Sequence, residues 1–152
     1  MRRIGTGCLL LAAVLVLSRA AAAHDWNESG IKWQNYDEGV ALAQKEKKPI
    51  CLVVFTEWCP HCKNYALIFH DPKVVAQAKR FVMIHVDKDQ NAPVNKKFQP
   101  DGDYIPRTFF LKPDGTLDAD IKAPRDKYQY FYDEKDPASV LAAMDAAQKK
   151  LK

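Results

Sequence analysis

An apolar run that leads directly into a pair of cysteines constrains the fold of this chain more than any other feature. Residues 50–55 read Ile-Cys-Leu-Val-Val-Phe, and Cys59-Pro60-His61-Cys62 follows after three further residues. A short apolar run bounded by proline and polar residues is typical of a buried strand. Pro60 suits the first turn of a helix, because a backbone N–H there would have no intrahelical partner. The segment therefore predicts a strand, a short loop and a helix that starts at the cysteines.

The rest of the chain predicts alternating helices and strands. Apolar periodicity predicts helices over Trp33–Glu46, from Pro60 to about His70, over Pro72–Arg80 and over Pro137–Leu151, and strands over Ile50–Phe55, Phe81–Asp87, Arg107–Lys112 and Thr116–Ile121. A polar connection with Pro93 and Pro100 precedes the third strand, and Pro113-Asp114-Gly115 predicts a hairpin turn before the fourth. Strands that alternate with helices pair in parallel, and a late hairpin adds an antiparallel edge. We expect a single α/β domain with a mixed sheet.

Residues 1–23 have the pattern of a secretory signal peptide. A basic start is followed by the apolar run Cys8–Leu17 and by small residues at Ala21–Ala23, so we expect cleavage before His24 and a mature domain over 24–152. No second apolar stretch of that length follows, and we expect no stable membrane insertion after cleavage. Removing this segment deletes three arginines and no acid, which lowers the net charge from +4 to about +1. That balance disfavours a nucleic-acid partner, which requires a basic surplus.

The mature chain keeps three cysteines in a compartment where disulfides persist. A bridge between Cys59 and Cys62 would close too small a loop to add much stability, which favours a redox dithiol. Structural zinc is the alternative, but it usually needs a second ligand pair, and His70 and His85 are isolated. We therefore expect no metal and no cofactor. Cys51, inside the apolar run, is expected to be a small buried residue, with a third reactive thiol as the alternative.

The position of the dithiol predicts different chemical roles for its two sulfurs. A cysteine at a helix N-terminus lies at the positive end of the helix dipole, which favours its thiolate. We expect Cys59 to be exposed and to form the mixed disulfide with a partner, and the more buried Cys62 to resolve it. An imidazolium at His61 would stabilise the Cys59 thiolate further and make the disulfide more oxidising.

Trp58 before the dithiol and Ile105-Pro106 before the third strand complete a recognisable pattern, and the chain resembles the thioredoxin superfamily over about residues 31–151. The resemblance implies a three-layer sandwich with a mixed central sheet flanked by helices. It implies that Pro106 is cis and packs beside the cysteines, and that Ile105 contacts the substrate chain. The catalytic residues that it implies are Trp58, Cys59, Pro60, His61 and Cys62.

Three groups within the superfamily share local features with this chain. Residues 102–111, with Trp33, Ala41, Gln44, Lys48 and Pro49, resemble the anterior-gradient group of endoplasmic-reticulum proteins. Residues 55–72 resemble the periplasmic reductase domain of thiol-disulfide interchange proteins. The dipeptide Pro60-His61 is that of the bacterial oxidase that introduces disulfides.

One departure from the family concerns proton transfer. Thioredoxins and disulfide oxidases usually hold a buried carboxylate six residues before the first cysteine, where this chain has Val53. Proton transfer to and from Cys62 would then use Glu57, Lys63 or water.

These features predict a monomeric thiol-disulfide oxidoreductase that acts on cysteines of exported proteins and is recycled by a redox partner protein. The direction, oxidase or isomerase against reductase, stays open. The chain ends in Lys149-Lys150-Leu151-Lys152 without an endoplasmic-reticulum retention signal. The short, alanine-rich signal peptide predicts the periplasm or another secreted location. The alternative is a redox-inactive binding or chaperone module that uses the tyrosine-rich segment 128–132, unless those aromatic side chains pack in the core.

Overall fold

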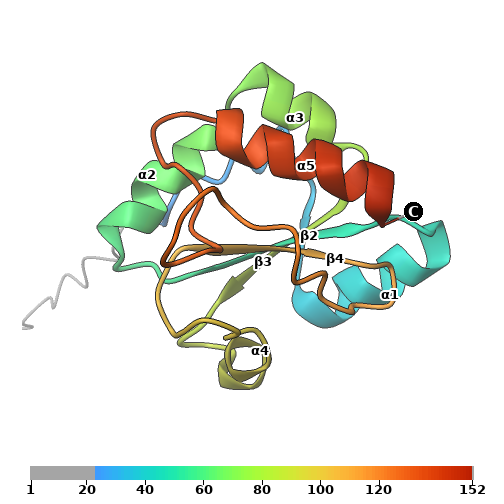
Figure 1. The fold of residues 1–152 in the computed structure, drawn as a ribbon, viewed down its shortest axis with the longest axis horizontal. Helices are drawn as coiled ribbons and strands as arrows, with labels where there is room; N and C mark the ends of the chain where they lie inside the picture. The colour runs from blue at the N-terminus through green and yellow to red at the C-terminus, as the bar shows by residue number, and fades with distance from the viewer. Residues whose placement is uncertain (1–22, 152) are drawn as a thin grey trace, which may run out of the picture.

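A computed structural model describes residues 23–151, so the predicted signal peptide, apart from Ala23, lies outside the described residues. The elements, in chain order, are β1 (Trp33–Gln34), α1 (Tyr36–Glu46), β2 (Ile50–Phe55), α2 (Pro60–Ile68), α3 (Pro72–Ala78), β3 (Val82–Asp87), α4 (Ala92–Lys97), β4 (Arg107–Leu111) and α5 (Ala138–Lys150), as Figure 1 shows. Among residues 23–151, no helix combines the length and the apolar character that a membrane span requires.

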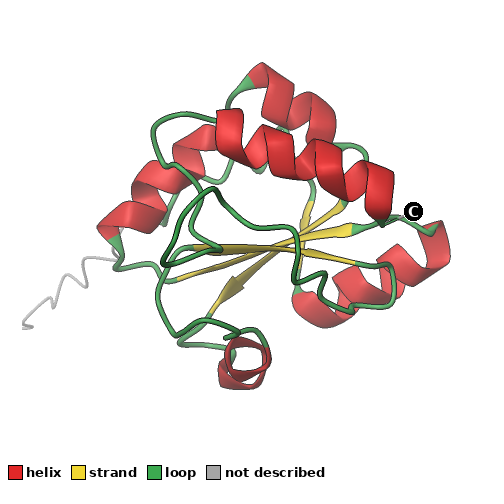
Figure 2. Ribbon diagram, viewed as in Figure 1, coloured by secondary structure: helices red, strands yellow, loops and turns green. Residues whose placement is uncertain are grey.

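The four strands form one mixed sheet in the order β1-β3-β2-β4. β3 pairs in parallel with both β1 and β2, whereas β4 runs antiparallel to β2. Helices cover both faces, with α2, α3 and α5 on one side and α1 and α4 on the other (Figure 2). The predicted three-layer sandwich is confirmed.

Every residue of β2 is buried, because both of its faces are covered. Cys51, Val53 and Phe55 point into the core beneath α2, α3 and α5, and the alternate residues face the core that contains α1 and α4. Burial on both faces explains why this strand reads as a continuous apolar run. Because β2 is buried on both faces, the loop that follows Phe55 begins at a fixed position at the edge of the core.

The predicted strand Thr116–Ile121 does not form. The turn is present, since the N–H of Gly115 and the carbonyl of Thr116 both bond to Lys112, but only an isolated bridge between Leu111 and Leu117 follows. The chain leaves the sheet at Asp118, whose carboxylate accepts bonds from the N–H of Asp120 and from the Lys150 ammonium.

Two other local predictions were wrong. The polar connection after β3 contains helix α4, which Asn91 caps by accepting the N–H of Val94 at 3.2 Å. Trp33 is not the start of a helix but lies in β1, opposite Met83. Helix α1 begins after Asn35, because the Asn35 side chain accepts a hydrogen bond from the first turn.

Candidate active site

Cys59 ends the loop after β2 and is the N-cap residue of α2. Its backbone is extended (φ −83°, ψ 117°), and its Sγ accepts a hydrogen bond from the backbone N–H of Cys62 at 3.1 Å. Pro60 occupies the first turn, as its sequence position predicted. An N-cap sulfur lies at the positive end of the helix dipole, where a thiolate is stabilised.

Cys59 is less accessible than the sequence suggested. It is only 3% exposed, so the expectation of an exposed Cys59 was wrong, whereas Cys62 is fully buried, as predicted. The reason is the capping bond, which turns the Cys59 sulfur toward the helix rather than toward solvent. A partner must therefore bring its own sulfur down to Cys59.

Burial separates the two thiols chemically. Loss of solvation, reinforced by the hydrogen bond with Cys59, raises the pKa of Cys62, although the backbone N–H of Thr56 acts in the opposite direction. Cys62 is therefore held as a thiol. This geometry fits a first sulfur that meets the partner and a second that stays protonated until it resolves the intermediate.

Ile105 and Pro106 lie immediately before β4, and the peptide bond between them is cis, as the family resemblance implied. Ile105 is half-buried and packs against the same core cluster that contains Cys59 and Cys62. The dithiol and the Ile105 side chain thus belong to the core on the same side of the sheet.

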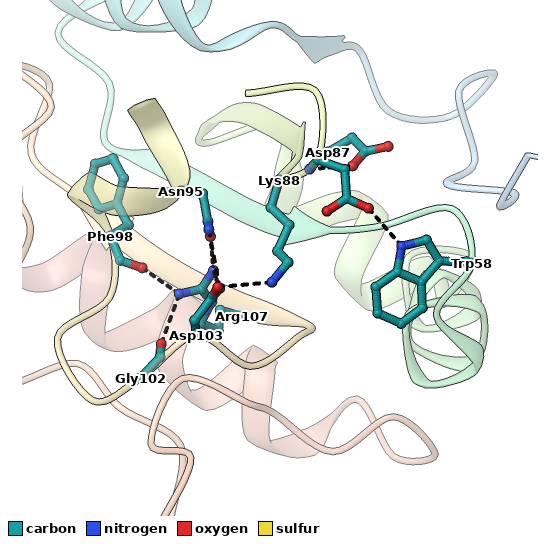
Figure 3. Close-up of polar contacts among 9 residues, drawn as sticks. Trp58, Asp87, Lys88, Asn95, Phe98, Gly102, Asp103 and Arg107 are labelled. Atoms are coloured by element: carbon teal, nitrogen blue, oxygen red, sulfur yellow. Dashed lines mark hydrogen bonds and ion pairs between the residues drawn. The ribbon is translucent and has the colours of Figure 1, made fainter. Parts of the chain in front are cut away.

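Trp58 is the most exposed of the large apolar side chains in the described structure, with 68% of its surface accessible. Its indole Nε1 donates a 2.7 Å hydrogen bond to Asp89 in the turn after β3 (Figure 3). The ring is therefore held in place while its face remains open to a partner, next to the less accessible sulfur of Cys59. No motif in the sequence indicated Asp89.

His61 is exposed at the start of α2, and its partner comes from the far end of the chain. Its Nδ1 lies 2.8 Å from a carboxylate oxygen of Glu134, and the other oxygen accepts a hydrogen bond from Asn64 at 3.2 Å. The rings of Phe131 and His61 pack edge to face, with their centroids 5.8 Å apart. Sequence reasoning missed Glu134, because the two residues are far apart and nothing local links them.

The tyrosine-rich segment divides between core and surface. Tyr130 and Tyr132 are each 1% exposed, and they lie in the cores on opposite faces of the sheet. Tyr128, in contrast, is 54% exposed. The packing interpretation of this segment therefore holds for two of its three tyrosines.

Hydroxyl groups lie where the family usually has a buried carboxylate. Val53 pairs with Thr108 of β4, and the Thr108 hydroxyl lies 2.8 Å from the hydroxyl of Tyr65 on α2. Lys63 is exposed on the surface of α2. Thr56, whose backbone N–H faces the Cys62 sulfur, has a fully buried hydroxyl without a hydrogen-bond partner among the described residues.

The loop before the dithiol also contacts the first residue of the expected mature chain. The backbone N–H of His24 donates to the Glu57 carboxylate at 3.1 Å, and its Nε2 donates to the Thr56 carbonyl at 2.9 Å. Glu57 is thus already engaged by another group.

Cys51 lies on β2 and is fully buried in the core. Burial raises the pKa of its thiol, so it stays protonated. These properties favour a packing role for Cys51. Within residues 23–151, no cluster of three or more His, Cys, Asp or Glu side chains could hold a metal ion.

A mixed sheet between two helical layers, a dithiol at a helix start and a cis-proline immediately before an antiparallel strand together define a thioredoxin-like protein. A thioredoxin-like family profile matches residues 32–113. The chain belongs to this family.

Its relatives include anterior gradient proteins, as the sequence resemblance predicted. Anterior gradient protein 2 homolog of Homo sapiens is 30% identical over 128 residues, which cover 84% of this chain and 71% of that protein. Anterior gradient protein 1 of Xenopus laevis is 31% identical over 133 residues, which cover 84% of this chain and 69% of that protein.

Solved structures confirm the fold. A thioredoxin from Thermus thermophilus aligns with a TM-score of 0.60 and 22% identity, over 77% of this chain and 86% of that one. A DsbH oxidoreductase aligns with a TM-score of 0.55 and 18% identity, over 97% of this chain and 96% of that one.

Proposed function

We propose that the protein is a thiol-disulfide oxidoreductase that exchanges disulfides with cysteines of exported proteins through Cys59 and Cys62. The observation that carries this proposal is the pairing of an N-cap sulfur with a buried thiol, in the core cluster against which Ile105, of the cis Ile105–Pro106 bond, also packs. The thioredoxin-like family and the DsbH oxidoreductase fold support the same chemistry.

In the reducing direction, the Cys59 thiolate attacks one sulfur of a partner disulfide. That S–S bond breaks, a mixed disulfide forms, and the released partner sulfur takes up a proton. Cys62 then gives its proton to water and attacks the Cys59 sulfur. The mixed disulfide breaks, the second partner sulfur leaves as a thiolate, and the two cysteines are oxidised by two electrons. The oxidising direction is the reverse, and a redox partner protein restores the starting state.

His61 and Glu134 affect the direction of disulfide exchange. An imidazolium near Cys59 favours its thiolate and hence an oxidising disulfide. The Glu134 carboxylate, 2.8 Å from His61 Nδ1, weakens the effect of that positive charge on Cys59. Measuring the Cys59–Cys62 equilibrium against glutathione separates an oxidase or isomerase from a reductase.

We place this activity in the periplasm or another secretory compartment, with residues 1–23 removed and the mature chain acting as a monomer. An N-terminal sequence of the exported protein that begins at His24, together with its mass in solution, tests this part of the proposal. A protein that keeps residues 1–23 after export, or one that forms a stable dimer, contradicts it.

The central test is a Cys62→Ala variant expressed with its natural export signal. We expect Cys59 to remain joined to partner proteins as mixed disulfides that a reductant releases on a gel. Cys51→Ala is the matched control, because it removes a buried thiol and should trap nothing. An absence of trapped partners, together with no thiol exchange by the purified wild type, would contradict the proposal.

The alternative, a redox-inactive binding module, depended on exposed aromatic residues in the segment 128–132. Only Tyr128 among its tyrosines is exposed, which weakens that alternative. Replacing Cys59 and Cys62 together by serine separates the two functions, because a binding module would keep its cellular role without the dithiol.

A further inference from the structure

A buried arginine holds the loop that carries Ile105 and Pro106. Arg107 is the first residue of β4, and its side chain is fully buried. Its Nη1 donates to the carbonyl of Phe98 at 2.8 Å and to the carbonyl of Gly102 at 2.9 Å (Figure 3). One guanidinium therefore ties two distant points of the loop to the start of the strand.

The second nitrogen of this guanidinium joins a network of side chains. Arg107 Nη2 donates to the Asn95 side-chain oxygen and lies 3.3 Å from an Asp103 carboxylate oxygen. Asn95 also donates to Asp103 at 3.2 Å, and the Lys88 ammonium lies 3.0 Å from the other Asp103 oxygen. The planar, always-charged guanidinium of Arg107 suits this arrangement, because its N–H groups donate hydrogen bonds in several fixed directions at once.

The network continues to the dithiol loop. Lys88 lies in the turn after β3, and its backbone N–H donates to the carbonyl of Phe55, the last residue of β2, at 2.9 Å. The next residue, Asp89, holds the Trp58 indole. The same turn therefore contacts the segment that leads into Cys59 and, through the Lys88 side chain, the loop that leads into Pro106 (Figure 3).

We propose that Arg107, together with Asp103 and Lys88, is a positioning unit that fixes the Ile105–Pro106 loop relative to the dithiol. The unit would determine how well an extended peptide docks beside Cys59, without touching the peptide itself. This inference rests on the proposed exchange activity. A contact between an extended peptide and Ile105 needs a loop held to within a fraction of an ångström, whereas a small disulfide needs only access to Cys59.

The test compares the single-turnover reaction of the reduced full-length mature protein with two probes, so that KM is the half-saturating probe concentration and kcat the limiting rate constant of that one turnover. One is a synthetic peptide with a single internal disulfide and a fluorophore–quencher pair, and the other is the small aromatic disulfide dithiobis(nitrobenzoic acid). The variants are Arg107→Lys, which keeps the charge but loses the planar guanidinium, and Lys88→Gln, a partly exposed site that should fold normally. Lys150→Gln is the matched control, because it breaks a lysine–carboxylate cluster between Lys150 on α5 and the carboxylates of Asp118 and Asp120.

We expect both Arg107→Lys and Lys88→Gln to raise the KM for the peptide, by roughly tenfold for Arg107→Lys, with a much smaller change in kcat. The loss in kcat/KM should be several times larger for the peptide than for the small disulfide, and Lys150→Gln should show no such difference. An unchanged peptide KM in folded Lys88→Gln and Arg107→Lys overturns the proposal, as does an equal loss for both probes.

A second measurement separates this inference from the exchange activity. In a chain with Cys59→Ser and Cys62→Ser, the affinity for the reduced peptide is measured by fluorescence anisotropy with and without Arg107→Lys. Weaker binding in the triple variant supports the positioning role even if the wild type exchanges neither probe, a result that would contradict the proposed function alone. Equal affinities overturn the positioning role.

Discussion

The buried state of Cys62 leads to a measurable dependence of stability on pH. An exposed thiol in the unfolded chain has a pKa of about 8.5, whereas burial raises the pKa of Cys62 in the folded protein. Above pH 8.5 the unfolded chain therefore releases a proton that the folded chain keeps, so the unfolded state gains stability. The contribution of Cys62 to stability is fully present below that pH and is lost as the pH rises.

The size of the effect follows from the linkage relation. If the folded thiol stays protonated between pH 8 and pH 10, ionisation of the unfolded thiol lowers the free energy of unfolding by about 2 kcal/mol. The reduced wild type should therefore lose about 2 kcal/mol more than Cys62→Ala over this interval. Cys51, whose pKa burial also raises, is the matched control, and Cys51→Ala should show the same difference.

Urea unfolding of the reduced proteins at a series of fixed pH values, followed by circular dichroism, measures these differences. The oxidised wild type adds a further control, because a disulfide removes the proton of Cys62 and leaves only the contribution of Cys51. If reduced wild type and Cys62→Ala fall in parallel while Cys51→Ala behaves as expected, Cys62 ionises as readily folded as unfolded. The different chemical roles predicted for the two sulfurs would then be refuted.

Three further predictions use other contacts. Glu134→Gln should make the dithiol about two- to fivefold more oxidising against glutathione, because it removes a negative charge that lies 2.8 Å from His61 Nδ1 and disfavours a thiolate at Cys59; an equilibrium with glutathione that does not change would disprove this influence. Burial lowers the pKa of His85, so the free energy of unfolding should decrease as the pH falls below about 6.5, by at most about 1.4 kcal/mol per pH unit. Urea unfolding of His85→Phe should lack this decrease, and parallel pH profiles of the wild type and the variant would contradict the prediction. In Gly39→Ala the new Cβ would overlap the buried side chain of Ile84, so we expect a loss of about 1–3 kcal/mol in thermal or urea unfolding despite the better helix propensity of alanine, and a stabilised variant would contradict that packing.

Local patterns predicted the elements that position the dithiol. The run Ile50–Phe55 is apolar at every position, which suits a strand covered on both faces, and Pro60 suits only the first turn of a helix. Both are short-range signals. The prediction failed at Thr116–Ile121, where the Asp118 carboxylate accepts the N–H of Asp120 in a local turn and also contacts Lys150 of α5, a residue that the local pattern does not contain.

The surroundings of the cysteines depended on contacts between distant segments. Glu134 meets His61, and Arg107 gathers the loop before it, but neither residue stands out in its own stretch of sequence. A charged side chain is expected at the surface, and Arg107 is buried only because the carbonyls of Phe98 and Gly102 and the side chains around them satisfy its nitrogens.

By itself, the sequence determined that a dithiol follows a buried strand at the start of a helix, because neighbouring residues decide backbone conformation there. Only the tertiary structure decided how those sulfurs are presented: Cys59 nearly covered, Cys62 fully covered, and the Ile105–Pro106 loop held beside them. Burial and charge pairing are properties of packed surfaces, and each depends on side chains that the fold brings together from separate parts of the chain.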